Sequence, residues 1–167
     1  MPERDMRIRE ATPEDALAAC EVLERSIVEL CDADHRNDAS ILALWLGNKT
    51  PANFRAWVDR ADNTVLVADE NGRVLAVGSV TDAGVIGLNY VSPDARFRGV
   101  SRALLRALEA RAADRGSRRC DLTSTRTARR FYLSNGYVDS GPPVRGFGTS
   151  SAYPMTKILS DPVRDAG

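Results

Sequence analysis

The sequence predicts an α/β fold in which helices cover both sides of a mixed sheet. Two strand-like runs flank Asn71-Gly72, the dipeptide that best accommodates a tight hairpin turn. An apolar, β-branched run over 85–91 breaks at Pro93 and restarts after an arginine-rich turn as an amphipathic helix, which indicates a βαβ crossover at the centre of the chain. The expected element order is β-α-α-β-β-β-α-β-α-β-β.

The first third of the chain predicts one strand and several helices. The strand covers Met6–Glu10, and Thr12, followed by a proline and two acids, supplies the N-cap of the first helix. The polar stretch 31–38 is expected to be a loop, with helical segments after it over 39–46 and 51–58. The first helix should turn these apolar side chains toward the core: Leu17, Cys20, Leu23 and Ile27.

Strands and helices alternate in the rest of the chain. The long helix after the arginine-rich turn should stop at Gly116 and bury Leu104, Leu105, Leu108 and Ala112. A later loop rich in Gly and Pro contains Gly146-Phe147-Gly148. The expected strands cover 64–68, 74–80, 85–91, 119–123, 137–140 and 153–159, and a short helix covers 128–135.

Composition limits the class of protein. The 167 residues fit one domain over 1–167, and 23 basic residues balance 23 acidic ones, so that no overall field favours a nucleic acid or an anionic membrane as partner. The three cysteines are odd in number and lack metal-ligand spacing, which argues against a disulfide framework or a metal site. The longest strongly apolar stretch, 41–46, is too short to span a bilayer. We therefore expect a cytoplasmic protein.

Residues 96–103 are expected to bind a diphosphate. The first turn of a helix carries unpaired backbone N–H groups and the positive end of the helix dipole, which attract phosphate. Gly99 allows a ligand to approach the backbone closely. Arg96, Arg98 and Arg102 add positive charge, and the planar guanidinium group is well shaped to bind phosphate oxygens.

Two motifs resemble those of the GNAT superfamily of acyl-CoA-dependent N-acetyltransferases. The stretch from Arg96 to Ser101 resembles the family's phosphate loop, which reads Arg or Gln, two residues, Gly, one residue, then Gly or Ala; Ser101 departs from it. The stretch from Thr125 to Tyr137 is similar to the second signature, with Thr125 at the usual asparagine position and Tyr132 in a Phe-Tyr pair. The resemblance covers nearly the whole chain, and it implies a GNAT-like fold whose central strands splay to form the CoA cleft.

The resemblance implies direct acetyl transfer from acetyl-CoA to an amine. A backbone N–H near Val91 would polarise the thioester, Asn89 and Tyr90 would hold the pantetheine arm, and Tyr132 would protonate the leaving thiolate. The cofactor-binding residues implied in this way are Asn89, Tyr90, Val91, Arg96, Phe97, Arg98, Gly99, Val100, Ser101, Arg102, Ala103, Thr125 and Tyr132.

The acceptor and the general base stay open. Many relatives place a glutamate on the strand before the phosphate loop, but the corresponding stretch 84–88 contains no acid. The candidates left for the acceptor side are Asp32, His35 and Asp82, although a lone histidine in a polar stretch is usually exposed. Asp34, beside them in sequence, is a further candidate for a base that acts through a water relay. The balanced charge favours a small-molecule amine over a basic polypeptide, and dimers are frequent in such folds. The alternative is a non-catalytic acyl-CoA-binding or regulatory module.

Overall fold

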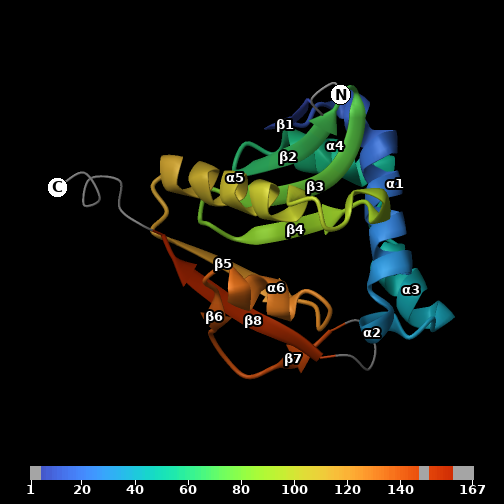
Figure 1. Ribbon diagram of the computed structural model, residues 1–167, viewed down its shortest axis with the longest axis vertical. Helices are drawn as coiled ribbons and strands as arrows, with labels where there is room; N and C mark the ends of the chain where they lie inside the picture. Colours follow the sequence, from blue (N-terminus) through green and yellow to red (C-terminus); the bar gives the residue numbers. More distant parts are fainter. Residues whose placement is uncertain (1–4, 147–150, 160–167) are drawn as a thin grey trace.

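The computed structural model describes residues 5–146 and 151–159, which form two sheets (Figure 1). The first sheet is antiparallel throughout, in the order β1 (Met6–Glu10), β2 (Asn63–Glu70), β3 (Arg73–Thr81) and β4 (Ile86–Val91). The second sheet has the order β5 (Arg119–Ser124), β8 (Ser151–Ile158) and β6 (Val138–Asp139), and β7 (Val144–Arg145) also pairs with β8.

The two sheets meet at a single isolated bridge, in which Val85 lies parallel to Asp121. The backbone N–H of Asp121 donates to the carbonyl oxygen of Gly84 at 2.9 Å. Gly84 has a φ of +87°, and a Cβ there would collide with the carbonyl oxygen of Arg119, so this close approach requires glycine. Beyond the bridge β4 and β5 separate (Figure 1), as the splayed arrangement predicts.

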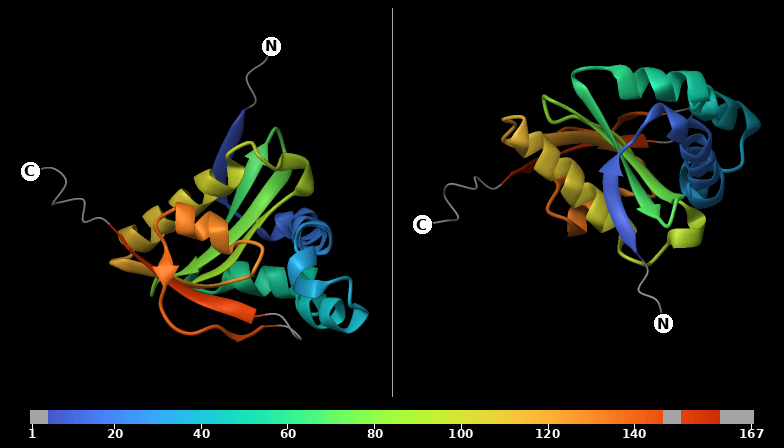
Figure 2. Two further views of the ribbon diagram at one scale, coloured as in Figure 1. Left: turned by 60° about the horizontal axis from the view of Figure 1, so that its bottom comes forward. Right: turned by 90° about the horizontal axis from the view of Figure 1, so that it is seen from above.

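Helices cover both faces of the first sheet, as seen from above in Figure 2. Alternate residues of β2 point to opposite faces: Val65 and Val67 pack with the first helix and α4, whereas Leu66 and Ala68 pack with α5. The helical segments are η1 (Pro13–Asp15), α1 (Ala16–Leu30), α2 (Asp32–His35), α3 (Ala39–Leu46), α4 (Pro51–Asp59), η2 (Pro93–Ala95), α5 (Val100–Asp114) and α6 (Arg129–Ser134).

Several local expectations are confirmed. Asn71 and Gly72 both have positive φ, 53° and 87°, as a primed hairpin turn between β2 and β3 requires. Helix α5 ends at Asp114, two residues before Gly116, whose φ is +93°. Its expected inward side chains, Leu104, Leu105, Leu108 and Ala112, are all buried.

Two expectations about the first third of the chain are wrong. Leu17 is 73% exposed, because α1 begins at Ala16 and its buried stripe runs through Ala16, Ala19 and Leu23 instead. The polar stretch 31–38 contains the short helix α2, and its Asp34 and His35 are buried rather than solvated.

The end of the chain is more strand-rich than expected. Strand β7 lies where the sequence predicts a loop rich in Gly and Pro, and it pairs with the first residues of β8. Residues Phe147 and Gly148 of that loop lie outside the described residues. Among residues 5–146 and 151–159, none of the helices combines the length and apolar character needed to cross a bilayer.

Candidate functional site

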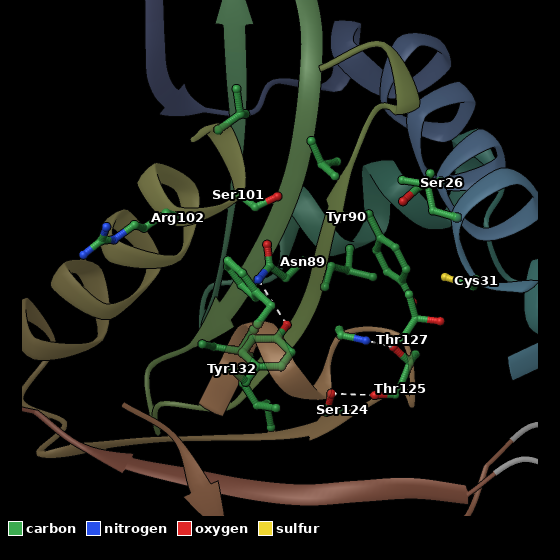
Figure 3. Close-up of a pocket in the computed structure, with 18 of the residues that line it drawn as sticks. Ser26, Cys31, Asn89, Tyr90, Ser101, Arg102, Ser124, Thr125, Thr127 and Tyr132 are labelled. Carbon is green, nitrogen blue, oxygen red and sulfur yellow. Dashed lines mark hydrogen bonds between the residues drawn. The ribbon is translucent and has the colours of Figure 1, made fainter. Parts of the chain in front are cut away.

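A cavity of about 410 Å³ opens where β4 and β5 separate (Figure 3). Its walls come from α1, β4, the turn before α5, β5 and α6. Except for Arg98 and Ala103, all the residues expected to bind the cofactor line this cavity. The structure thus brings together segments that lie between residues 26 and 132 of the chain.

The first turn of α5 forms one end of the cavity. Gly99 precedes the helix with a φ of +78°, and the N–H of Ala103 makes the first i to i−4 bond, to the carbonyl oxygen of Gly99 at 3.1 Å. The N–H groups of residues 100–102 precede that bond and have no acceptor within the helix. They are therefore available to an anion at this end, as expected from the sequence.

The three arginines expected at this end differ in their surroundings. Arg98 forms an ion pair with Glu70 and does not line the cavity. Arg102 lines the cavity, but its guanidinium group extends away from the centre along α5 (Figure 3). Arg96 lines the cavity, lies over the Phe97 ring at 4.7 Å, and forms no ion pair within the described part of the chain. Arg96 is thus the best placed of the three to meet a phosphate.

Strand β4 presents backbone N–H groups to the cavity. The N–H of Ser92 donates to the carbonyl oxygen of Leu75 in β3 at 2.7 Å. Because the amides of a strand alternate in direction, the N–H groups of Val91 and Asn89 point to the opposite edge, toward β5. No described strand pairs with β4 along that edge beyond the bridge at Val85, since the two strands have separated.

The side chains of Asn89 and Tyr132 meet inside the cavity. Asn89 Nδ2 donates a hydrogen bond to Tyr132 Oη at 3.0 Å (Figure 3). Burial raises the pKa of the Tyr132 hydroxyl to about 12, while the bond from Asn89 lowers it. Tyr132 is therefore a neutral phenol whose oxygen already accepts one bond, which leaves its proton for another partner.

Tyr90 points to the other side of β4, as the alternation of a strand requires (Figure 3). Its hydroxyl oxygen accepts a hydrogen bond from Trp45 Nε1 at 3.3 Å. Burial raises the pKa of the Tyr90 hydroxyl, so this residue is also neutral. Tyr90 and Asn89 thus give the two faces of β4 different polar groups.

The loop before α6 is held by a buried carboxylate that sequence reasoning did not single out as an anchor. Asp34 accepts hydrogen bonds from the N–H groups of Arg126 and Thr127 at 2.7 and 3.1 Å and from the Thr127 hydroxyl. Thr125 Oγ1 accepts from the N–H of Ala128 at 3.1 Å, and this bond orders the start of α6. Asp34 was expected only as a candidate base acting through water, and local sequence does not predict its anchoring role because its partners lie more than 90 residues away.

Comparisons with known proteins agree with this geometry. The family model described as an acetyltransferase (GNAT) domain matches residues 35–159. The chain belongs to the GNAT acetyltransferase family. This membership supports acetyl transfer as the general reaction. A comparison with curated protein sequences returns no match.

Solved structures of GNAT proteins resemble this acetyltransferase over nearly its whole length. A GCN5-related N-acetyltransferase from Rhodopseudomonas palustris is 26% identical with a TM-score of 0.80, and the match covers 92% of this chain and 95% of that one. The PaiA N-acetyltransferase of Thermoplasma acidophilum, in complex with coenzyme A, has a TM-score of 0.76 and is 17% identical. The match covers 93% of this chain and 99% of that one. YncA of Salmonella typhimurium, a putative acetyltransferase solved with acetyl-CoA, has a TM-score of 0.71 and is 22% identical. The match covers 94% of this chain and 95% of that one. The last two likenesses bear on the fold alone.

The residues expected on the acceptor side do not enter the cavity of this GNAT acetyltransferase. The ring of His35 is fully buried: Nε2 donates to the carbonyl oxygens of Ile27 and Val28 at 2.9 and 3.1 Å, and Nδ1 accepts from the N–H of Asn37 at 2.9 Å. Both ring nitrogens are thus engaged with the backbone, which makes His35 the residue that joins α1 to α2.

The two expected aspartates also lie elsewhere. The Asp32 side chain is 69% exposed, with Oδ1 at 3.7 Å from His35 Nε2. The carbonyl oxygen of Asp82 accepts a bond from the Ser117 hydroxyl at 2.7 Å at the base of the splayed strands. Neither of them lines either cavity at the splay.

A second cavity of about 620 Å³ adjoins the first, with which it shares lining residues of β4 and β5. It is bounded by α2, the α3–α4 turn, the ends of β2 and β3, and the strands β7 and β8. Trp45 and Trp57 both line it, while Trp45 also belongs to a buried core cluster and Trp57 packs against another. The residues shared by the two cavities are Gly87, Leu88, Tyr90, Thr123, Ser124 and Thr125. Within the described residues, no group of three His, Cys, Asp or Glu side chains could hold a metal ion.

Proposed function

We propose that this GNAT protein, as one domain over residues 1–167, moves the acetyl group of acetyl-CoA to a primary amine of a small-molecule or peptide acceptor by direct attack. One observation carries the proposal. The first turn of α5, the outward N–H of Val91 and the Tyr132 hydroxyl all line the same cavity, and each supplies what one part of a thioester co-substrate needs.

The diphosphate of the co-substrate would lie at the first turn of α5. The N–H groups of residues 100–102 supply donors there, and Arg96 supplies charge at the entrance. Ser101 is half-buried at this position, so its hydroxyl adds a donor where the family's pattern has Gly or Ala. Because Arg98 is held by Glu70, we assign it to the stability of the loop rather than to the phosphate.

The pantetheine arm would run along the free edge of β4. The N–H groups of Asn89 and Val91 point into the space left by β5, and a backbone donor aimed at the thioester oxygen stabilises the negative charge that develops there during attack. Thr125 faces the same space, although its hydroxyl oxygen already accepts a bond from Ala128.

Tyr132 would act as the proton donor for the sulfur of the leaving CoA. The acceptor amine forms the C–N bond, the C–S bond breaks, and CoA leaves as the thiol after gaining one proton, while the amine loses one. With the pKa of Tyr132 at about 12 and a thiol near 8.5, complete transfer of the phenol proton is uphill by about 5 kcal/mol. Tyr132 therefore donates a hydrogen bond to the sulfur as charge develops, and it passes its proton to the sulfur only as water delivers to the phenol oxygen the proton that the amine has lost.

Among the described residues, the one carboxylate or imidazole side chain that lines these cavities is Asp34, which three hydrogen bonds tie to the loop before α6. The amine therefore loses its proton to water. An α-amino group, with a pKa of about 8, meets this requirement more readily than a lysine side chain at about 10.4.

The alternative is a binding module that keeps the cofactor site without turnover, and the same lack of a free base favours it. Thermal unfolding with acetyl-CoA and release of CoA thiol across a panel of amines separate the two. We expect a rise in melting temperature and amine-dependent thiol release above the no-amine background. Stabilisation without release from any amine would favour the binding module, and no stabilisation would contradict both.

A further inference from the structure

The second cavity carries an excess of positive charge. Its lining includes Lys49, Arg60 and Arg145, whereas its one acidic side chain among the described residues is Asp34. The Asp34 carboxylate is already occupied by three hydrogen bonds from the loop before α6. Among the described residues Asp34 forms no ion pair with these cations, and its single negative charge leaves the lining with an excess of positive charge.

Among the residues that the structure describes, two of the three cations have no carboxylate partner. Arg60 is paired with Asp62 through two contacts of 3.1 and 3.2 Å, so its charge is largely balanced. Lys49 Nζ contacts the neutral side-chain oxygen of Asn48 at 2.7 Å, and neither Lys49 nor Arg145 forms an ion pair with any residue that the structure describes. These two side chains thus present uncompensated charge to the cavity.

The partly buried position of Lys49 makes it more favourable for an anion to bind beside its ammonium group. Its side chain is partly buried, and this desolvation lowers the pKa of its ammonium group. A desolvated cation without a counter-charge is costly, and a ligand anion that enters the cavity reduces that cost. Lys49 lies in the turn between α3 and α4, and Arg145 lies in β7. Two segments that are far apart in the sequence thus each place a positive charge at the same cavity.

The rest of the cavity offers an aromatic surface. Trp57 is half-buried and packs its ring edge-on against Phe54 at 6.5 Å between centroids. Trp45 is held by its bond to the Tyr90 hydroxyl. Because both rings are fixed by neighbours, they provide a rigid apolar wall, to which an apolar group of a ligand can bind at little entropic cost.

We propose that the acceptor is a primary amine that also carries a carboxylate and an apolar group. The carboxylate binds Lys49 and Arg145, the apolar group lies against Trp57, and the amine points toward the residues that the two cavities share. This inference rests on the proposed acetyl transfer. The same charges disfavour polyamines and lysine-rich peptides, because a like charge would enter a cavity that has no free carboxylate among its described lining residues.

Matched amines test the role of the carboxylate. Thiol release is measured with phenylalanine, phenylalaninamide and phenethylamine at a fixed concentration of acetyl-CoA. We expect kcat/KM for phenylalanine to exceed that for the amide by about tenfold or more. The amine of the amide is the less basic of the two, so a preference for the free acid cannot come from a more easily lost proton. Leucine and leucinamide repeat the comparison without an aromatic ring.

Variants test the two cations. In Lys49→Met and Arg145→Gln, we expect the ratio of kcat/KM for phenylalanine over phenylalaninamide to fall by about fivefold or more, mainly through the KM for phenylalanine. Arg115→Gln is the control, because Arg115 is an exposed cation at the end of α5 and lines neither cavity. Binding of the product N-acetylphenylalanine, measured by calorimetry with CoA present, should weaken in the same two variants and not in the control.

The outcomes separate this inference from the function on which it rests. Thiol release that is equal or faster with the amides, or a ratio unchanged in both Lys49→Met and Arg145→Gln, would overturn the carboxylate assignment and leave acetyl transfer intact. If no amine releases thiol and acetyl-CoA does not stabilise the protein, both the function and the inference fail.

Discussion

Asn89 Nδ2 donates to Tyr132 Oη across 3.0 Å, and this hydrogen bond joins the last strand of the first sheet to the helix of the second. It lies where the two sheets are no longer paired. The bond fixes the direction of the phenol and occupies one lone pair of its oxygen, so that the hydroxyl proton has to find a different acceptor. In the proposed reaction that acceptor is the sulfur.

Tyr132→Phe removes this proton and keeps the ring. We expect kcat to fall by about tenfold or more, because donation to a leaving group typically contributes at least that much. The dissociation constant for acetyl-CoA should change by less than about threefold, since the phosphate contacts are untouched. Steady-state thiol release and calorimetry measure the two quantities. The control is Tyr153→Phe, whose ring stacks with Arg129 away from the cavity. Unchanged turnover in Tyr132→Phe would mean that water protonates the sulfur.

Asp34→Asn replaces one acceptor oxygen by an amide donor that faces backbone N–H groups of residues 126 and 127. We expect a loss of about 2 kcal/mol in the free energy of unfolding, because a buried hydrogen bond to a charged group is lost and a donor is left unpaired. Urea denaturation measures it. The matched control, Asp32→Asn, changes an exposed side chain two residues away and should lose less than about 0.5 kcal/mol. Equal losses in the two variants would contradict the anchoring role.

Arg96→Gln and Arg98→Gln distinguish the cavity arginine from the paired one. Arg96 lines the cavity, whereas Arg98 is engaged by Glu70 outside it. We expect Arg96→Gln to raise the dissociation constant for acetyl-CoA by about threefold to tenfold and to weaken its dependence on salt. Arg98→Gln should change the constant by less than about twofold. A larger effect of Arg98→Gln would mean that the ion pair breaks when the phosphates bind.

The stability of the protein should fall above pH 9. Burial raises the pKa of the Cys31 thiol from 9.0 to about 12 and that of Cys120 to about 11, so the folded state keeps protons that the unfolded state releases. The stabilisation is complete below the unfolded pKa and is lost as the pH rises through the folded one. Each thiol contributes a slope of about 1.4 kcal/mol per pH unit between these values.

Urea denaturation at pH 8, 9 and 10 in the presence of a reductant measures this slope. Cys31→Ala should flatten it by about 1.4 kcal/mol per unit above pH 9, whatever its effect on stability at pH 8. A slope that is the same in the variant and in the original protein would show that Cys31 ionises in the folded state.

The sequence predicted best those features that depend on neighbouring residues. The Asn71-Gly72 turn, the glycine before α5 and the apolar stripe of α5 follow from local backbone preferences and helical spacing, and the structure confirms them. Several residues that line the first cavity were predicted through the two motifs, each of which is continuous in sequence, whereas the lining residues of α1 were not predicted. A continuous motif can be recognised from the sequence without knowledge of the tertiary fold.

The expectations that are wrong depended on contacts between distant segments. His35 looks like a solvated residue in a polar stretch, yet its ring lies at the end of α1, where Nε2 donates to two carbonyl oxygens of the last helical turn. Leu17 looks like a core residue, but the helix starts one residue before it and rotates it outward. Lys49 and Arg145 lie almost one hundred residues apart, and nothing in the local sequence of either predicts a common cavity.

The six residues common to both cavities have a kinetic consequence. Because each cavity has bounding segments of its own, neither reactant has to leave its cavity before the other one binds. In the proposed reaction the acetyl donor and the amine are bound at the same time, and they meet at the residues that both cavities share. The architecture therefore imposes no ping-pong sequence, and no residue of the protein has to carry the acetyl group between two half-reactions.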